Sequence, residues 1–248
     1  MTIRLNEVYP AAQGEGPSTG TPSLFVRLAG CNLRCVWCDS HFTWYYKDKN
    51  FGDESRFPFQ KVDKVDEVRE YSEASFLELV RDEAKKAGVK NIILTGGEPM
   101  LQWRAVLASL RPLKSEGYRF EIETNGTVSI DHEFGLFIDQ VNCSPKLGNS
   151  GNEMEARFKR KALLSIAHHR NHSLKFVYTG QPEDEREIDM IVLEGGFLPS
   201  HVYVMPEGTT RESQMGDAYE RTVAFATRAG FKVSPRVHVL INGTKRGV

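Results

Sequence analysis

The segment Asn91-Ile92-Ile93-Leu94-Thr95-Gly96-Gly97-Glu98-Pro99 joins a short, β-branched apolar run to a polar, glycine-rich turn. A predicted strand followed by a polar loop returns three times, at Glu123-Thr124-Asn125-Gly126, Ser144-Pro145-Lys146 and Thr179-Gly180-Gln181-Pro182. The carboxyl ends of parallel strands are where α/β folds build their sites. These four loops therefore predict one pocket at the ends of neighbouring strands.

Strand-like runs alternate with helical stretches along the chain. Apolar, β-branched runs predict strands at residues 24–28, 91–94, 120–123, 140–143, 174–178, 202–205 and 237–241. Phe76, Val80 and Ala84 form one apolar helical face, in a helix that a capping box at Ser75 opens and Gly88 ends. Because parallel neighbours need a crossover, which a helix supplies, this order indicates a parallel sheet.

Roughly six such units leave two α/β architectures open, an open doubly wound sheet and a partial (β/α) barrel. Four loops around one pocket favour the barrel. The length of 248 residues suits a single domain, residues 1–248. Residues 43–72 are charged and aromatic with weak periodicity, which indicates an insertion. The alternation at residues 61–66 favours a short edge strand or hairpin arm over a lid on the site.

Positive and negative side chains nearly cancel, with 32 Lys and Arg against 33 Asp and Glu. A balanced charge gives no general field for nucleic acid or an anionic membrane, and it favours a small-molecule substrate. The first residues lack the apolar run of a signal peptide, and no stretch approaches the roughly 18 apolar residues that span a bilayer. We therefore expect a cytoplasmic protein.

Three of the four cysteines lie in the loop Cys31-Asn32-Leu33-Arg34-Cys35-Val36-Trp37-Cys38. In a reducing compartment, such crowding favours metal ligation over disulfides. Three thiolates in one loop can wrap one face of an iron–sulfur cluster and leave one iron open. Structural zinc is the alternative, but zinc normally takes four ligands, and the sequence has no second Cys-x-x-Cys knuckle. Cys143 stands alone in an apolar run and is interpreted as a buried small hydrophobe.

The Cys-xxx-Cys-xx-Cys spacing after a first strand resembles the radical S-adenosylmethionine (SAM) superfamily. This resemblance implies a partial (β/α)6-type TIM barrel of the radical SAM type and a [4Fe–4S] cluster whose open iron SAM chelates. The turn at 96–99 resembles the segment that binds the methionyl amino group, and the Glu98 carboxylate suits an ammonium group. The resemblance also implies SAM contacts from Trp37, Cys38 and Asp39.

Several segments are similar, more narrowly, to the 7-carboxy-7-deazaguanine synthase family. They are Gln13-Gly14-Glu15-Gly16, Phe25-Val26-Arg27-Leu28-Ala29-Gly30, Cys38-Asp39-Ser40, the four strand-end loops except the last, and Lys245-Arg246-Gly247-Val248. The resemblance implies a lyase that converts 6-carboxy-5,6,7,8-tetrahydropterin to 7-carboxy-7-deazaguanine with loss of ammonia. The reaction is a SAM-derived radical ring contraction in queuosine and deazapurine biosynthesis. A glycyl-radical-activating enzyme shares the cysteine spacing, but it would need neither Gln13-Gly14-Glu15-Gly16 nor Ser40.

The family resemblance implies roles for single residues. The pterin would meet Ala12, Gln13, Gly14, Arg27 and Thr95, and SAM would also meet Gly97, Ser144, Pro145, Lys146, Gln181, Pro182, Glu183 and Asp184. Arg27 suits the substrate carboxylate because its planar guanidinium binds carboxylates bidentately, with a salt bridge to a strand neighbour as the alternative. Ser40 would be the only protein ligand of a Mg²⁺ ion, which keeps few such ligands. A flavodoxin-like electron donor and a homodimer are further implications.

Overall fold

The strands form one curved sheet in a computed structural model, which describes residues 1–46, 55, 57, 68–243, 245 and 247. Within these residues, the strand order is β3-β1-β2-β4-β5-β6-β7-β8-β9. The bounds are β1 Thr2–Ala12, β2 Pro22–Leu28, β3 Arg69–Ser72, β4 Asn91–Gly96, β5 Arg119–Thr124, β6 Gln140–Cys143, β7 His172–Tyr178, β8 Val202–Pro206 and β9 Lys232–Val233.

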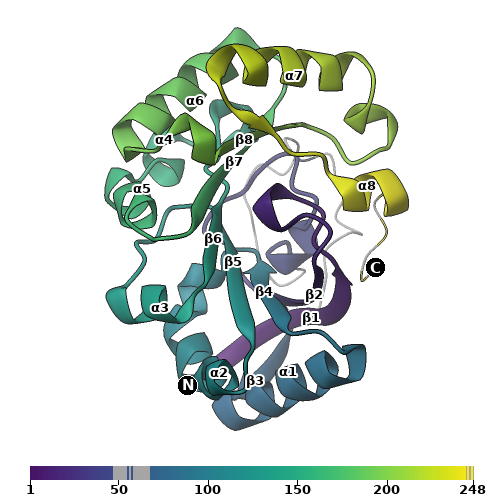
Figure 1. The fold of residues 1–248 in the computed structure, drawn as a ribbon, viewed down its shortest axis with the longest axis vertical. Helices are drawn as coiled ribbons and strands as arrows, with labels where there is room; N and C mark the ends of the chain where they lie inside the picture. Colours follow the sequence, from purple (N-terminus) through teal and green to yellow (C-terminus); the bar gives the residue numbers. More distant parts are fainter. Residues whose placement is uncertain (47–54, 56, 58–67, 244, 246, 248) are drawn as a thin grey trace.

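Neighbouring strands from β2 to β9 are all parallel, whereas β1 is antiparallel to both β2 and β3. The helices are α1 Glu73–Ala87, α2 Trp103–Ser115, α3 His132–Phe137, α4 Met154–Arg157, α5 Arg160–Ala167, α6 Pro182–Gly195, α7 Asp217–Ala229 and α8 Val237–Asn242. Figure 1 shows the sheet curled into an open arc with α1 to α7 around its convex side. This arrangement confirms the predicted partial barrel.

The two faces of the sheet differ in polarity because side chains alternate along a strand. Fully buried residues such as Leu24, Ile92 and Phe120 belong to the apolar core that packs against the helices. Thr95 and Lys175, each next to a core leucine in its strand (Leu94 and Leu174), instead line a cavity inside the arc. The strands therefore place a polar inner surface within a helix-covered barrel.

One boundary and one element type predicted from the sequence are wrong. Helix α1 begins at Glu73 with Ser72 as its N-cap, where the Ser72 hydroxyl accepts the Ser75 backbone N–H at 3.2 Å. The β3 strand ends at Ser72, so the helix starts there instead of at Ser75. Residues 237–241 form most of α8 instead of a strand, since a short apolar run has no periodicity that separates strand from helix.

The first strand, β1, was not predicted, although it pairs with β2 from Leu5 to Ala12. Within the predicted insertion, residues 69–72 form the edge strand β3. The proposed hairpin arm at 61–66 lies outside the described residues. No helix in the described part of the chain is long and apolar enough to cross a membrane.

Candidate active site

A cavity of about 1220 Å³ opens inside the barrel at the carboxyl ends of the strands. Its walls include residues from the β1–β2 hairpin, the cysteine loop, and the ends of β4, β5 and β7. Fourteen of the predicted site residues line it: Ala12, Gln13, Gly14, Arg27, Cys31, Cys35, Trp37, Cys38, Asp39, Ser40, Thr95, Gly97, Ser144 and Lys146. The barrel therefore brings together segments that are more than 130 positions apart in the chain.

Six predicted SAM contacts do not line this cavity: Glu98, Pro145, Gln181, Pro182, Glu183 and Asp184. Asp184 is buried behind it, where its carboxylate accepts Asn149 Nδ2 at 3.0 Å. Asn149 in turn accepts the Trp37 indole N–H at 3.0 Å through its backbone oxygen. Hydrogen bonds through Asn149 thus connect Asp184 to Trp37 in the cavity wall.

The three clustered cysteines are free thiols that face one side of the cavity. Each sulfur accepts one N–H: Cys31 from Leu33 N at 3.4 Å, Cys35 from Asn152 Nδ2 at 3.3 Å and Cys38 from Trp44 Nε1 at 3.3 Å. Trp44, Tyr45 and Phe57 form a buried aromatic group packed against Cys31 and Cys38. The loop therefore offers three thiolate ligands, N–H donors to their sulfurs, and an apolar screen from water.

Burial raises the pKa of Cys31 to about 11 and that of Cys38 to about 12. These thiols will not ionise at neutral pH without a bound cation, because burial disfavours the charged form. No group of three His, Cys, Asp or Glu side chains in the described ranges is arranged to hold a metal ion. In a [4Fe–4S] cluster each thiolate binds a different iron, so its ligands need not converge on one point. The donor set and its apolar screen fit such a cluster.

The Trp44 indole provides a test of this fit. Hydrogen bonds to ligand sulfurs stabilise the more negative, reduced cluster and raise its reduction potential. We expect Trp44→Phe to lower the cluster potential by roughly tens of millivolts, since one such bond is worth about 1 kcal/mol. A potentiometric titration followed by electron paramagnetic resonance measures this, and an unchanged potential contradicts it.

The glycine-rich turn after β4 allows the backbone to approach the β2 end closely. A Cβ on Gly96 would lie 2.1 Å from the Leu28 carbonyl oxygen, and a Cβ on Gly97 would lie 2.1 Å from the Gly30 carbonyl oxygen. Gly96 also has a φ of +137°, which side chains rarely adopt. Glycine is therefore required here for packing the turn against the cysteine loop.

Glu98 is fully buried and bonded within the protein. Its Oε1 accepts Met100 N at 3.0 Å and the Thr124 hydroxyl at 2.8 Å, while Oε2 accepts Asn125 N at 2.7 Å. Burial raises the pKa of its carboxyl, against these hydrogen bonds. In this geometry Glu98 joins the loops after β4 and β5.

Arg27 lines the cavity from β2 and bonds to the neighbouring strand β1. Its Nε donates to Glu7 at 2.8 Å and its Nη2 donates to the Tyr9 hydroxyl at 2.6 Å. The structure thus contains the salt bridge that was the alternative for this residue. Among the described residues, Nη1 of Arg27 makes no hydrogen bond, and the Tyr9 and Phe42 rings lie 5.7 Å from the guanidinium carbon.

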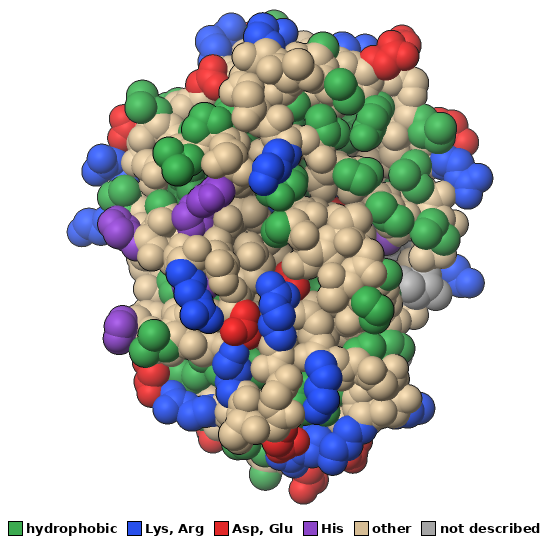
Figure 2. Space-filling view, viewed as in Figure 1, with side chains coloured by type: hydrophobic (Ala, Val, Ile, Leu, Met, Phe, Trp, Pro, Cys, Tyr) green, Lys and Arg blue, Asp and Glu red, His purple; other side chains and the backbone are tan. Residues whose placement is uncertain are grey.

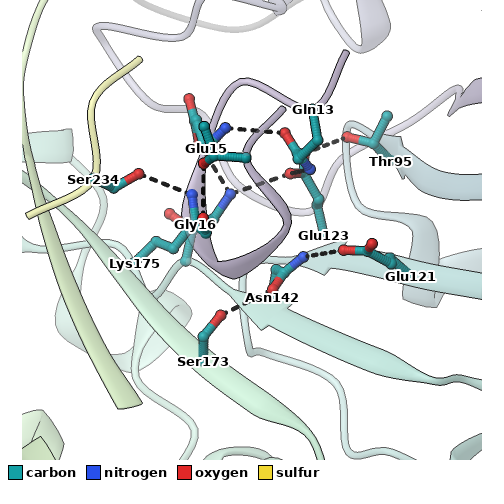
Figure 3. Close-up of polar contacts among 12 residues, drawn as sticks. Gln13, Glu15, Gly16, Thr95, Glu121, Glu123, Asn142, Ser173, Lys175 and Ser234 are labelled. Atoms are coloured by element: carbon teal, nitrogen blue, oxygen red, sulfur yellow. Dashed lines mark hydrogen bonds and ion pairs between the residues drawn. The ribbon is translucent and has the colours of Figure 1, made fainter. Parts of the chain in front are cut away.

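A charged network that the sequence does not predict also lines the cavity. Lys175 Nζ lies 2.9 Å from Glu15 Oε2 and 3.1 Å from Glu123 Oε1, and Arg236 bonds Glu15 at 2.9 Å and also Asp39. Figure 3 shows Glu15, Glu123 and Lys175 pointing toward one another. The signal was a lysine inside the apolar run Leu174-Lys175-Phe176-Val177, where charge is rare unless paired.

The network sets the ionisation of its members. Burial works against charge, but Lys175 and Arg236 hold the pKa of Glu15 well below its usual range. Asp39 is half-exposed; partial desolvation acts to raise the pKa of its carboxyl, but Arg236 outweighs it and lowers that pKa. Outside the cavity, the face in Figure 2 intersperses Lys and Arg with Asp and Glu side chains. Inside the barrel, Lys175 lies within 3.1 Å of both Glu15 and Glu123, so these three charges form a compact buried cluster.

Comparisons with known proteins agree with this architecture. The model of the radical SAM superfamily matches residues 26–193. A 7-carboxy-7-deazaguanine synthase from Pyrobaculum aerophilum is 31% identical over 246 residues, 99% of this chain and 97% of the relative. One from Halobacterium salinarum is 33% identical over 261 residues, covering 96% and 90%. The crystal structure of QueE from Escherichia coli superimposes with a TM-score of 0.67 at 24% identity, covering 96% and 95% of the two chains, and supports the fold.

A partial parallel barrel with three cysteines at its strand ends is the architecture of a radical SAM protein, and the matched residues place the chain in that superfamily. Membership implies a [4Fe–4S] cluster and SAM. Within the superfamily, the chain belongs to the 7-carboxy-7-deazaguanine synthase family.

Proposed function

We propose that this chain converts 6-carboxy-5,6,7,8-tetrahydropterin to 7-carboxy-7-deazaguanine with loss of ammonia. Family membership supports this reaction. The observation that carries the proposal is the single cavity that joins the three cysteines to the Gln13-Gly14 turn. A cluster, SAM and a small bicyclic substrate can share a cavity of about 1220 Å³. When bound, the cluster and SAM supply a 5′-deoxyadenosyl radical.

Residues on the cysteine side would hold SAM. Lys146 Nζ lies 5.4 Å from the centre of the Trp37 ring and donates to Ser144 Oγ at 2.9 Å, so these three side chains form one cavity wall. Gly97 also lines the cavity. Pro145 and residues 181–184 would support this wall from behind. Trp44 and Phe57 would exclude water, which protects a reactive radical.

Residues on the opposite side would hold the pterin. Arg27, through its Nη1, would receive the substrate carboxylate. Thr95 donates its hydroxyl proton to Glu123 Oε2 at 3.1 Å, so its oxygen remains an acceptor for a substrate N–H. Ala12, Gln13 and Gly14 approach from the β1–β2 hairpin.

Ser40 would bind a Mg²⁺ ion. Its hydroxyl faces the cavity, lies 3.2 Å from Asp39 Oδ1 and is within a few residues of the cysteine ligands. A single hydroxyl fits this ion because Mg²⁺ keeps most of its water and often takes ligands from its substrate. We further propose a flavodoxin-like electron donor, a homodimer and a cytoplasmic location, where reducing conditions preserve free thiols.

The test is product analysis of anaerobic, reduced enzyme with SAM, Mg²⁺ and the carboxytetrahydropterin. We expect 7-carboxy-7-deazaguanine and one ammonia for each substrate consumed. Absence of deazaguanine, together with radical formation on a protein glycine, would instead assign the chain to the glycyl-radical activators. A colourless preparation with one zinc would assign it to zinc-binding modules.

Ser40→Ala tests the magnesium site. We expect the variant to keep its cluster and SAM binding but to lose the stimulation of turnover by added Mg²⁺, since the protein ligand is gone. Titration of activity with Mg²⁺ measures this for the wild type and the variant. Ser40→Thr is the matched control, because it retains a hydroxyl and should retain the stimulation. Equal Mg²⁺ dependence in Ser40→Ala and wild type would disprove the site.

A further inference from the structure

Lys175 joins two parts of the cavity wall that are distant in sequence. Its side chain is only 3% exposed and lies between Glu15, in the turn after β1, and Glu123, near the end of β5. The aliphatic part of Lys175 also passes beneath the turn, since a Cβ on Gly16 would lie 3.2 Å from its Cδ. The ammonium group therefore contacts the hairpin and the barrel wall at once.

Glu123, through its carboxylate, and Glu15, through its backbone N–H, connect Lys175 to predicted substrate contacts. Glu123 Oε1 also accepts Gln13 Nε2 at 3.1 Å, and Glu123 Oε2 accepts the Thr95 hydroxyl at 3.1 Å. The Gln13 side-chain oxygen accepts the Glu15 backbone N–H at 3.2 Å. Figure 3 shows this chain of contacts from Lys175 through Glu123 to Gln13 and Thr95. Gln13 and Thr95 are thus oriented by a carboxylate that Lys175 fixes.

We propose that Lys175 is a positioning residue for the pterin side of the cavity, where its ammonium group orients Glu123 and docks the hairpin turn at residues 13–16. This inference rests on the proposed function, because the pterin is assigned to Gln13 and Thr95 there. The turn has other attachments, from Arg236 to Glu15 and from Gly16 N to Ser234 Oγ at 2.9 Å. Glu123 has no such second cation among the described residues.

The ionisation of Glu123 follows from its neighbours. The titratable groups that face it are Lys175 from β7, Glu15 from the hairpin turn and Tyr9 from β1. Burial raises the pKa of Glu123, but Lys175 outweighs burial and keeps it low. Without Lys175, burial and the Glu15 charge act in the same direction and raise that pKa. A protonated Glu123 would carry a hydrogen on one carboxyl oxygen, so it could no longer accept the hydrogen bond from either Gln13 or Thr95 at that oxygen.

The test compares Lys175→Met, Lys175→Arg and the matched control Lys114→Met. Lys114 forms a similar ion pair with Asp139 at 2.6 Å, but on the outside of the barrel. Three quantities are measured in cluster-loaded enzyme: the KM for the pterin, the pH profile of kcat/KM, and amide hydrogen exchange of residues 13–20 without substrate. In Lys175→Met we expect a roughly tenfold or larger rise in KM, faster exchange in residues 13–20, and an acid limb of kcat/KM at higher pH.

Lys175→Arg should restore all three properties, because a guanidinium can pair both carboxylates. If Lys175→Met has the same KM, the same acid limb of kcat/KM and the same hydrogen exchange as the wild type, the proposal is overturned. This holds even if the variant melts at a lower temperature. If Lys175→Met does not fold, the double variant Glu123→Gln/Lys175→Met removes one unpaired charge. It should show a raised KM without the shifted acid limb, and a wild-type KM there would overturn the proposal. Absence of product from wild type would refute the proposed function alone, since the exchange measurement still decides the docking role of Lys175.

Discussion

Cys35→Ala is expected to yield a colourless protein that forms no deazaguanine above background. Cys35 is one of three thiols on the cavity wall, and two remaining ligands cannot hold a cluster that leaves a fourth iron open. The anaerobically purified wild type should be brown and absorb at about 400 nm, because it holds an iron–sulfur cluster. Iron and sulfide analysis, the absorbance spectrum and product formation measure the effect.

Cys143→Ala is the matched control for this substitution. Cys143 is fully buried in the core beside Gly126 and does not line the cavity. Its removal should cost on the order of 1 kcal/mol of unfolding free energy through a small cavity, while colour and activity persist. Loss of the cluster in Cys143→Ala, or its retention in Cys35→Ala, would contradict the assigned ligands.

Glu98→Ala is expected to lower the melting temperature by roughly 10 °C. The change leaves three buried donors without their acceptor, the backbone N–H groups of Met100 and Asn125 and the hydroxyl of Thr124. Each unsatisfied buried group costs about 1–3 kcal/mol, and one kcal/mol lowers the melting temperature of a chain of this size by about 2–4 °C. Thermal unfolding without SAM measures the effect directly.

Glu98→Gln separates a role in the loop from a direct bond to SAM. The amide keeps the shape of the side chain but replaces one acceptor oxygen with a donor, so we expect a smaller fall in melting temperature. If Glu98 instead binds the SAM ammonium group, the variant will keep its melting temperature and lose SAM affinity in equilibrium dialysis. That result would contradict the position of Glu98 behind the cavity.

Local patterns predicted most of the elements that position the site. The sequence predicts β2, β4, β5 and β6 because their apolar, β-branched runs end in glycine or polar loops. The long strand β1 was missed because its pairing partners, β2 and residues 69–72, come later in the chain. Residues 237–241 were assigned to a strand because a short apolar run looks alike in both states.

The sequence by itself determined the chemistry of the ligands. Three cysteines in eight residues, a Gly-Gly-Glu-Pro turn and a run of strand-end loops are local features, and their spacing limits what they can bind. The tertiary structure alone decided which polar side chains face the cavity. Glu98 and Asp184 accept hydrogen bonds from the protein and do not line the cavity. Glu15, Glu123 and Lys175 form ion pairs in the cavity wall. The physical reason is that long-range pairing fixes which face of each strand turns inward, and a charge buried there requires a partner that only the folded barrel supplies.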